Sequence, residues 1–586
     1  MAILDEISAP ADVKNLPAAR LGELAAAVRE RIIRATGECG GHLSSNLGAV
    51  ELEIALLRVF DPPRDAVLFD VSHQTYAWKM LTGRAGAFSS LRRTDGISGF
   101  QRRCESPMDA FGAGHAGTAL SAAMGFAAAK MCGASPAGAV VAVVGDAAAG
   151  NGISLEALDD LLESGLPVLV VLNDNSSAAP PGIAERFAAH ALKSVGPIDG
   201  HDIGLVEENL KRLRDLDGPR LLRVATQKGR GFAPAERDPE AWHSTGPFDP
   251  ETGVRRECRP GFVSWSDAFG DFLLECAEKD PAVFAITAAM TAGTGLSRFA
   301  KALPGRFRDV GIREAHQGSF AAGLAAAGMK PVVAVYSTFF QREWDSFVHD
   351  AALQRLPVLL ALDRAGVVPG DGATHHGVFD IALLRPVPGV VVMQPRSPAQ
   401  LRSMVRTALA PGAPPCAIRW PRGEVPDDSG ADSGELVRIG SAVEISRTGA
   451  KPKVAIWTLG PEDAYARQIA AALVAAGVDS AHVDARFAKP VDEALLAREA
   501  EEGVEVFFTW EDGVKTGGFG EEVRGALQNR PEKPSVVAFG WPDEFLPHAT
   551  SREDLMARCG LEPAAAAAAI MEALAARRKN FAGSTN

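Results

Sequence analysis

The sequence predicts an α/β protein made of three doubly wound domains with mostly parallel sheets. Short apolar runs rich in Val, Ile and Leu recur along the chain, and segments with helical periodicity follow most of them. Strands that alternate with helices in this way pair in parallel within a layered domain. The length of 586 residues is enough for about three such domains.

The composition indicates a cytoplasmic enzyme. The formal net charge of −13 argues against a nucleic-acid or membrane partner, so an anionic substrate would need a local basic pocket. Seven scattered cysteines without a CxxC pair indicate neither a disulfide framework nor a zinc site. The first residues lack the basic and apolar regions of a leader, and no apolar run approaches the length expected of a membrane span.

The first predicted domain, residues 1–250, is organised around residues 139–180. This stretch has the pattern strand, loop, helix, strand, loop. The first strand runs into Asp146 and the second into Asn175. A right-handed crossover places both strand ends at one edge of a parallel sheet, so we expect Asp146 and Asn175 to meet there.

Asp146 and Asn175 have the chemistry of a magnesium site. A carboxylate and a carboxamide supply oxygen ligands, and substrate phosphates complete the coordination shell. The alternative is structural, with Asp146 capping the next helix and Asn175 closing a turn. This stretch alone leaves both interpretations open.

Histidines gather in loops before this stretch. His42, His73 and His115 each have small Gly or Ser neighbours. One such histidine is more often structural, but three in loops around one sheet edge favour chemistry, because these loops carry functional residues. A later basic loop, Lys228 to Arg230, fits either an anion site or a solvated surface.

The second predicted domain, residues 263–423, follows a linker at 249–262. Its strand candidates are AVFAITA, KPVVAVYST, PVLLALDRAG, GVVVMQP and CAIRWPRG. Arg364 and Arg422 follow two of these strands directly, where bidentate phosphate recognition is favoured over surface decoration.

The third predicted domain, residues 436–580, follows a second linker at 424–435. Its strand candidates are KVAIWTLG, SAHVDAR, VEVFFTWED and PSVVAFGW. It lacks a dense group of His and Arg residues, so we expect a structural or dimerising role.

Taken in order, the motifs resemble those of the 1-deoxy-D-xylulose-5-phosphate synthases, thiamine-diphosphate enzymes related to transketolase. The most specific are DVSHQTYAWKMLTGR, LNDN, GPIDGHD, KGRGFAPAERDP, YSTFFQREWD, LDRAG, DGATHHGVFD and PRG. The resemblance covers nearly the whole chain. It implies two thiamine-diphosphate-binding folds followed by a transketolase C-terminal-like domain.

The resemblance implies a cofactor site between the first two domains. Asp146 and Asn175 would bind Mg²⁺ together with the backbone carbonyl of Ser177. Glu314 would hydrogen-bond the pyrimidine ring of thiamine diphosphate and promote its imino tautomer. Further cofactor-binding residues would be His73, Gly114, His115, Ala116, Ala147, Ala148, Asn175, Phe232 and Phe339.

The resemblance also implies the reaction. Pyruvate would be decarboxylated and joined to D-glyceraldehyde 3-phosphate, in a homodimer serving isoprenoid and thiamine biosynthesis. His42, His243, His375 and Asp371 would handle pyruvate and its protons. Tyr336, Arg342, Arg364 and Arg422 would hold the phosphate of the acceptor.

Several positions depart from the pattern of the family. Ala147 stands where the family has Gly, Ser176-Ser177 replaces Glu-Met, and the segment from Asn175 to Gly196 is shorter. Ala315 and Trp420 replace Gln and Tyr. Two alternatives therefore stay open: a divergent enzyme, forming an acyloin with another aldehyde or transferring a ketol group, and a non-catalytic binding protein on the same fold.

Overall fold

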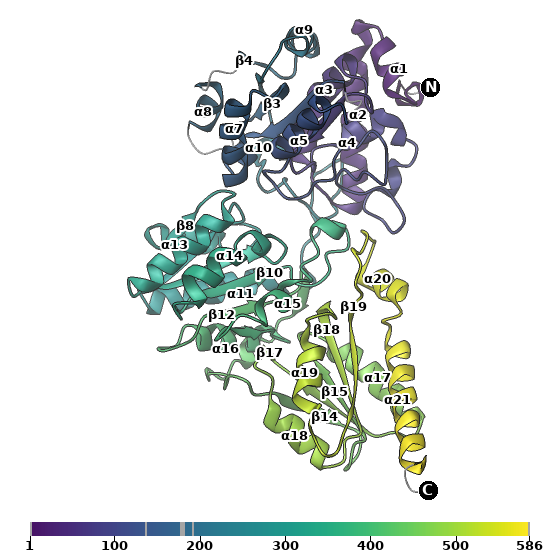
Figure 1. Cartoon of the computed structure of the whole chain (residues 1–586), viewed down its shortest axis with the longest axis vertical. Coiled ribbons are helices and arrows are strands. Elements are labelled where there is room, and N and C mark those ends of the chain that lie inside the picture. The colour runs from purple at the N-terminus through teal and green to yellow at the C-terminus, as the bar shows by residue number, and fades with distance from the viewer. Residues whose placement is uncertain (1–2, 135–137, 176–181, 190–192, 584–586) are drawn as a thin grey trace.

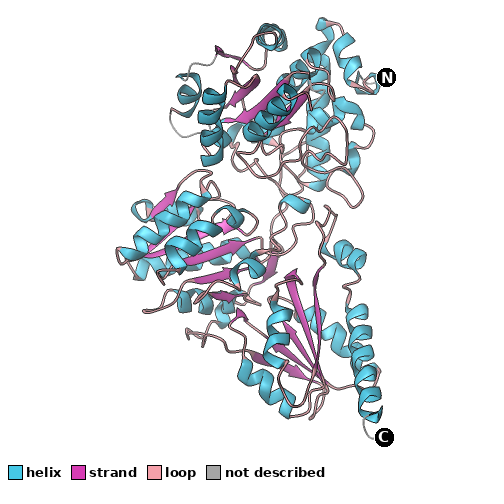
Figure 2. Cartoon of the chain, in the orientation of Figure 1, coloured by secondary structure: helices cyan, strands magenta, loops and turns pink. Residues whose placement is uncertain are grey.

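The computed structural model describes residues 3–134, 138–175, 182–189 and 193–583. Three α/β bodies follow one another along the long axis, with the N- and C-termini at opposite ends (Figure 1). Helices cover both faces of the sheets (Figure 2). The predicted α/β class with mostly parallel sheets is confirmed.

The first sheet has five strands, all parallel, in the order β1-β2-β3-β5-β4. They are β1 (Ala66–Phe69), β2 (Val140–Gly145), β3 (Val168–Asp174), β4 (Lys193–Asp199) and β5 (Arg220–Ala225). Strands β2 and β3 are the two predicted within residues 139–180. Strand β4 escaped prediction because it is an exposed edge strand without an apolar pattern.

The helices of the first body are α1 (Pro10–Asn15), α2 (Leu21–Cys39), α3 (Ser44–Val59), α4 (Tyr76–Lys79), α5 (Ala119–Met131), α6 (Asp146–Ala149), α7 (Gly152–Ser164), α8 (Ile183–Ala189), α9 (Ile203–Arg214) and α10 (Ala233–Arg237). The predicted loop around His42 is shorter than expected, because α3 begins at Ser44. Gly40 and Gly41, at φ of 68° and 139°, end α2 and turn the chain into this loop.

The second sheet has seven strands in the order β17-β11-β12-β10-β9-β7-β8. They are β7 (Val283–Thr287), β8 (Phe307–Asp309), β9 (Lys330–Tyr336), β10 (Leu359–Asp363), β11 (Val391–Met393), β12 (Cys416–Arg419) and β17 (Phe487–Lys489). Strand β17 comes from the predicted third domain and pairs antiparallel with β11. Its three residues are too short to signal this exchange in sequence.

The helices around the second sheet are α11 (Trp265–Lys279), α12 (Ser297–Ala302), α13 (Glu314–Ala326), α14 (Trp344–Ser346), α15 (Asp380–Leu384) and α16 (Pro398–Ala408). The two predicted linkers touch each other. Strand β6 (Phe262–Ser264), where the first linker ends, pairs antiparallel with β13 (Glu424–Pro426), where the second begins. This ribbon ties the entry of the second body to its exit.

The third sheet has the order β14-β16-β15-β18-β19, and only its edge strand β14 is antiparallel. The strands are β14 (Val443–Arg447), β15 (Val454–Thr458), β16 (Ser480–Asp484), β18 (Val506–Val514) and β19 (Ser535–Trp541). The helices are α17 (Asp463–Ala475), α18 (Glu493–Glu501), α19 (Phe519–Leu527), α20 (Arg552–Cys559) and α21 (Pro563–Gly583).

One helical stretch, Arg552–Lys579, is long and apolar enough by length and composition to cross a membrane. The expectation that no run approaches this length is therefore wrong. The stretch is divided into α20 and α21 in the structure. Ala566, Ile570 and Leu574 of α21 pack into the core of the third body.

Candidate active site

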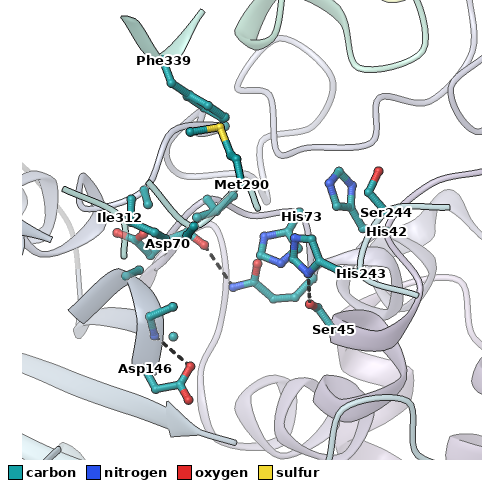
Figure 3. A pocket seen from close by; sticks show the side chains of 18 of the residues that line it. His42, Ser45, Asp70, His73, Asp146, His243, Ser244, Met290, Ile312 and Phe339 are labelled. Carbon is teal, nitrogen blue, oxygen red and sulfur yellow. Dashed lines mark hydrogen bonds between the residues drawn. The ribbon is translucent and has the colours of Figure 1, made fainter. Parts of the chain in front are cut away.

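A cavity of about 240 Å³ lies where the first and second bodies meet. Its walls come from both, with Asp146 and a group of histidines on the first body and Met290 and Phe339 on the second (Figure 3). Ligand sites of open α/β sheets are found at the carboxyl ends of parallel strands, and several of these residues follow such strands.

Asp146 and Asn175 meet at one end of the cavity, as the βαβ pattern predicted. The amide N–H of Asn175 donates to Asp146 Oδ2 at 3.3 Å, and the amide N–H of Ala147 donates to Oδ1 at 2.8 Å. Burial raises the pKa of Asp146, while the ammonium of Lys228 opposes this shift. The buried carboxylate therefore lies in a field that suits a cation and phosphate oxygens.

Three imidazole rings meet on the opposite side (Figure 3). The rings of His42 and His73 are 5.1 Å apart, and that of His243 lies 5.5 Å and 5.0 Å from them. Burial lowers the pKa of all three, to about 4 for His243. They are neutral at pH 7, so each ring offers one donor and one acceptor nitrogen.

Asn46 fixes two of these histidines. Its side-chain amide donates to the carbonyl oxygens of His42 and His73, each at 2.7 Å, and accepts from the N–H of Tyr76 at 2.8 Å. His42 Nδ1 and His73 Nδ1 have no hydrogen-bond partner among the described residues. A buried polar atom left in this state is typical of a ligand site.

His115 and His375 line the junction between the two bodies. His115 Nε2 lies 2.9 Å from the carbonyl oxygen of Thr374, and its ring packs edge-on against Phe339. His375 stacks on Phe100, with ring centroids 4.7 Å apart. Burial lowers the pKa of His115 to about 4 and of His375 to about 3, so both rings are neutral.

Glu314 is the first residue of α13, and its buried carboxyl lines the cavity. Burial raises its pKa, against the smaller effects of a backbone hydrogen bond and of Arg342. A buried carboxyl with a raised pKa can hold or release a proton near neutral pH. This is the group on the second body best placed to exchange a proton with a bound ligand.

Asp371 links two arginines from different bodies. It forms a buried ion pair with Arg92 of the first body and a partly exposed one, at 3.0 Å, with Arg422 of the second. Burial raises the pKa of Asp371, but the two guanidinium groups outweigh it and hold the pKa well below its usual range. The guanidinium of Arg364 lies 3.8 Å from the ring centre of Tyr336.

The structure brings most of the predicted site residues together. The cavity is lined by His42, His73, Gly114, Ala116, Asp146, Ala147, Ala148, Asn175, His243, Glu314, Tyr336, Phe339, Arg364, Asp371 and His375. Arg422 and His115 do not line it but contact residues that do. Arg342 also lies outside the lining and acts electrostatically on Glu314 and His115.

Two predicted residues do not join this group. The ring of Phe232 packs against Trp242 and Phe248 in the core of the first body and is not among the residues that line the cavity. Its position in a glycine-rich loop gave no sign of this packing. Ser177, the third predicted magnesium ligand, lies outside the described residues.

Sequence reasoning missed several residues of the site. Asp70 accepts from the amides of Gly117 and Ala119 at 2.8 Å and 3.0 Å and so fixes the loop before α5. Arg92 and Met290 also escaped notice. A signal was available for Asp70, which ends a strand as Asp146 does, but not for Arg92, whose partner is 279 positions away.

Models of known families match nearly the whole chain. The model described as 1-deoxy-D-xylulose-5-phosphate synthase matches residues 4–185 and 179–226. The transketolase pyrimidine-binding domain matches residues 262–428, and the transketolase C-terminal domain matches residues 442–565.

Three curated relatives that match over nearly the full length are named 1-deoxy-D-xylulose-5-phosphate synthase. The protein of Syntrophotalea carbinolica is 40% identical, over 97% of this chain and 97% of its own. The protein of Acidobacterium capsulatum is 41% identical over 96% of this chain and 97% of its own. That of Thiobacillus denitrificans is 41% identical over 98% and 99%.

Solved structures with some likeness are transketolases. A split-gene transketolase, described as an inactive beta4 tetramer, has a TM-score of 0.47 and 30% identity over 53% of this chain and 98% of its own. Transketolase from Leishmania mexicana has a TM-score of 0.46 and 16% identity over 94% and 97%.

Proposed function

Because the chain belongs to the 1-deoxy-D-xylulose-5-phosphate synthase family, we propose that its cavity carries out the reaction of that family. The chain is a thiamine-diphosphate-dependent transferase. Pyruvate is decarboxylated, and its two-carbon remainder is joined to D-glyceraldehyde 3-phosphate to give 1-deoxy-D-xylulose 5-phosphate. The observation that carries the proposal is that the buried Glu314 lines the same cavity as Asp146 and Asn175.

The residues of the cavity fit thiamine diphosphate and Mg²⁺. Asp146 and Asn175 offer oxygen ligands beside Lys228, which suits a cation bridged to a diphosphate. No group of three or more His, Cys, Asp or Glu side chains able to hold a metal occurs within the described ranges. Phosphate oxygens of the cofactor and backbone carbonyls, that of Ser177 among them, would supply the other ligands of the magnesium ion.

The close approach of the two bodies also fits a narrow cofactor site. A Cβ atom at Gly114 would lie 2.3 Å from Thr374 Cβ, so only glycine allows this loop of the first body to pass that of the second. We propose residues 1–250, 263–423 and 436–580 as the three domains, with the site between the first two.

The chain's own residues position the reactants and move protons. Thiamine diphosphate, when bound, supplies the carbon nucleophile. Glu314 would exchange a proton with the pyrimidine ring of the cofactor, which a buried carboxyl with a raised pKa can do. The neutral rings of His42, His243 and His375 would donate to, or accept from, pyruvate oxygens. Met290 and Phe339 keep this side of the cavity apolar.

The phosphate of the acceptor would bind to the arginines of the second domain. Arg364 lines the cavity at the end of β10, beside Tyr336. Arg422 is held next to it by Asp371. Two guanidinium groups at one place favour a phosphate dianion over a neutral aldehyde.

We propose that the active molecule is a homodimer. Helix α5 is rich in small apolar residues, and Ser121 and Gly125 on one of its faces are exposed. Such a helix is usually buried, so we propose that the exposed face of α5 is covered by a second copy of the chain. All seven cysteines are free thiols in the structure, in keeping with the cytoplasm as its compartment.

A product assay tests the proposed function. Purified protein with thiamine diphosphate and Mg²⁺ is given pyruvate and D-glyceraldehyde 3-phosphate, and CO₂ and 1-deoxy-D-xylulose 5-phosphate are measured. We expect both products, and neither without the cofactor. CO₂ release with a different condensation product would support the divergent-acceptor alternative, whereas failure to release CO₂ with any aldehyde would overturn the proposal.

A further inference from the structure

Glu343 is a fully buried carboxyl group beside Glu314 that the mechanism above does not use. Its side chain is 0% exposed. Glu343 Oε2 accepts a hydrogen bond of 2.7 Å from Gln317 Nε2. Glu343 Oε1 and Gln317 Oε1 both lack a partner among the described residues. A buried carboxylate with one hydrogen bond would be strongly destabilised.

The surroundings of Glu343 favour its neutral form. Burial raises its pKa to about 8, and the nearby Glu314 raises it too, against the hydrogen bond from Gln317. Among the described titratable groups on the elements packed around Glu343, only the charge of Glu314 shifts the pKa of Glu343. The others are His316 on α13, Lys330 on β9, Arg342 on η6 (Phe339–Arg342), Asp345 on α14, and His349 and Asp350 on η7 (Phe347–Ala352).

A neutral Glu343 also accounts for the two oxygens without partners. A carboxylic acid and a primary amide can share two hydrogen bonds, one N–H donated by the amide and one O–H donated by the acid. The acid hydrogen of Glu343 would then be donated to Gln317 Oε1. An ionised Glu343 has no hydrogen to donate, so it leaves this acceptor unpaired.

The pair is built into the start of the helix that carries Glu314. Glu314 is the first residue of α13, and Gln317 lies three residues further along the same helix. A Cβ atom at Gly318 would lie 3.0 Å from Glu343 Cγ and 2.5 Å from Ser346 Oγ, so α13 packs directly against the segment of Glu343. A change in the side chain of Glu343 therefore alters the packing of the first turn of α13.

We propose that Glu343 is a positioning residue for Glu314, an inference that rests on the proposed function. As a neutral acid, Glu343 holds Gln317 and the first turn of α13, and it keeps a second negative charge away from Glu314. Once Glu343 ionises, its charge makes Glu314 hold its own proton more tightly. Glu314 then exchanges that proton less readily with the pyrimidine ring of the cofactor.

The titration of Glu343 can be measured on the protein without cofactor. When the pKa of a carboxyl group is higher in the folded than in the unfolded protein, the folded state binds more protons at any pH between the two values. The free energy of unfolding therefore falls as pH rises through that range. Glu343→Gln removes this loss, so we expect its Tm to be higher than that of the wild type. The difference in Tm should grow as pH rises from about 5 and should become constant above about pH 8. Parallel Tm curves would overturn the proposal.

Activity provides the second measurement, with a matched control. The kcat of the wild type should fall as pH rises through about 8, and Glu343→Gln should lack that fall while KM for pyruvate stays within about twofold. Glu499 is another buried carboxyl with a pKa raised by burial, to about 7, and it accepts from Trp457 Nε1 in the third domain. Glu499→Gln should keep the wild-type profile of kcat. Identical profiles for Glu343→Gln and wild type would overturn the proposal.

A third variant covers the case that Glu343→Gln does not fold. Glu314→Gln removes the negative charge beside Glu343, so the pKa of Glu343 should decrease. The Tm of this variant should therefore stop falling at a lower pH than the Tm of the wild type. An unchanged plateau would overturn the coupling of the two carboxyl groups. The Tm measurements need no turnover, so failure of the proposed function, seen as absence of product from the wild type, is distinguishable from failure of this inference.

Discussion

At the scale of single residues, the site depends on buried groups whose charge is set by their neighbours. Asp371 stays ionised because Arg92 and Arg422 flank it, whereas Glu314 lies in surroundings that favour its proton. The two carboxyl groups line the same cavity, and their pKa values are shifted in opposite directions. This difference supports the proposed roles of proton exchange for Glu314 and charge pairing for Asp371.

The first prediction concerns Glu314. Glu314→Gln keeps the shape of the side chain but removes the exchangeable acid proton, so thiamine diphosphate should still bind while kcat falls by at least about 10²-fold. Cofactor binding by fluorescence quenching and steady-state turnover would measure the two effects. Near-normal turnover would assign the role to another group.

The second prediction concerns Asp146. Asp146→Ala should abolish retention of Mg²⁺ and thiamine diphosphate, since this side chain is the carboxylate at the proposed metal site. Circular dichroism should remain that of the wild type, because among the described residues Asp146 accepts two hydrogen bonds, from the backbone N–H groups of Ala147 and Asn175. Wild-type affinity for the cofactor in this variant would refute the assignment.

The third prediction concerns the acceptor arginines. Arg364→Ala or Arg422→Ala should raise KM for D-glyceraldehyde 3-phosphate about ten- to a hundred-fold, the cost of a charge-assisted contact of roughly 1.5–3 kcal/mol. Arg→Lys should restore only part of the loss, because an ammonium cannot form the bidentate contact. Pyruvate decarboxylation without acceptor should change little.

An unphosphorylated aldehyde is the control for this arginine pair. It cannot use a phosphate site, so its KM should be nearly the same in wild type and variants. Equal losses for phosphorylated and unphosphorylated aldehydes would rule out a phosphate role for Arg364 and Arg422. Arg422→Ala should also raise the pKa of Asp371, since one of its two guanidinium partners is lost.

At the scale of elements, loops at the ends of parallel strands form the site, and tight packing holds them. The loop before α5 is fixed by Asp70, and the loop that carries Asp371 and His375 meets it from the other domain. Glycine at position 114 allows this contact.

The fourth prediction therefore concerns Gly114. Gly114→Ala places a methyl group against Thr374, and overpacking of this kind costs about 1–3 kcal/mol. We expect weaker cofactor binding and a lower Tm. Gly152→Ala is the matched control, because nothing lies within 4 Å of its added Cβ on α7. Unchanged cofactor affinity in Gly114→Ala would show that the two loops separate freely.

At the scale of the whole molecule, all three domains contribute to the environment of the site. Asp371 joins the first two through Arg92. The third domain supports the same loops, since the amide of Ala549 donates to the carbonyl of Pro369 at 2.9 Å and His548 Nε2 lies 3.0 Å from the carbonyl of Gly96. The third domain thus contacts the loops beside Asp371 as well as forming its own core.

The fifth prediction concerns assembly. Gly125→Glu puts a charge on the exposed face of α5, where no atom lies within 4 Å of an added Cβ. We expect the variant to elute as a monomer in size-exclusion chromatography with light scattering, and the wild type as a dimer. Gly22→Glu, on α2 with equally open surroundings, should remain dimeric. A dimer in both variants would place the interface elsewhere.

The sequence determined most of the alternation of strands and helices and the meeting of Asp146 with Asn175. These follow from local periodicity and from the handedness of βαβ crossovers, which act over about thirty residues. The histidine loops were also visible locally, since small residues around His42 and His73 mark loops, one between α2 and α3 and one after β1.

Only the tertiary structure decided the remainder. The pairs Arg92 with Asp371 and Gln317 with Glu343, the burial of Phe232 in a core, and the transfer of β17 into the second sheet join residues far apart in the chain or on separate elements. Single-sequence periodicity records which face of an element is apolar, but not which element covers it. The charge states of the site residues depend on which elements pack against one another, because burial and neighbouring charges set each pKa.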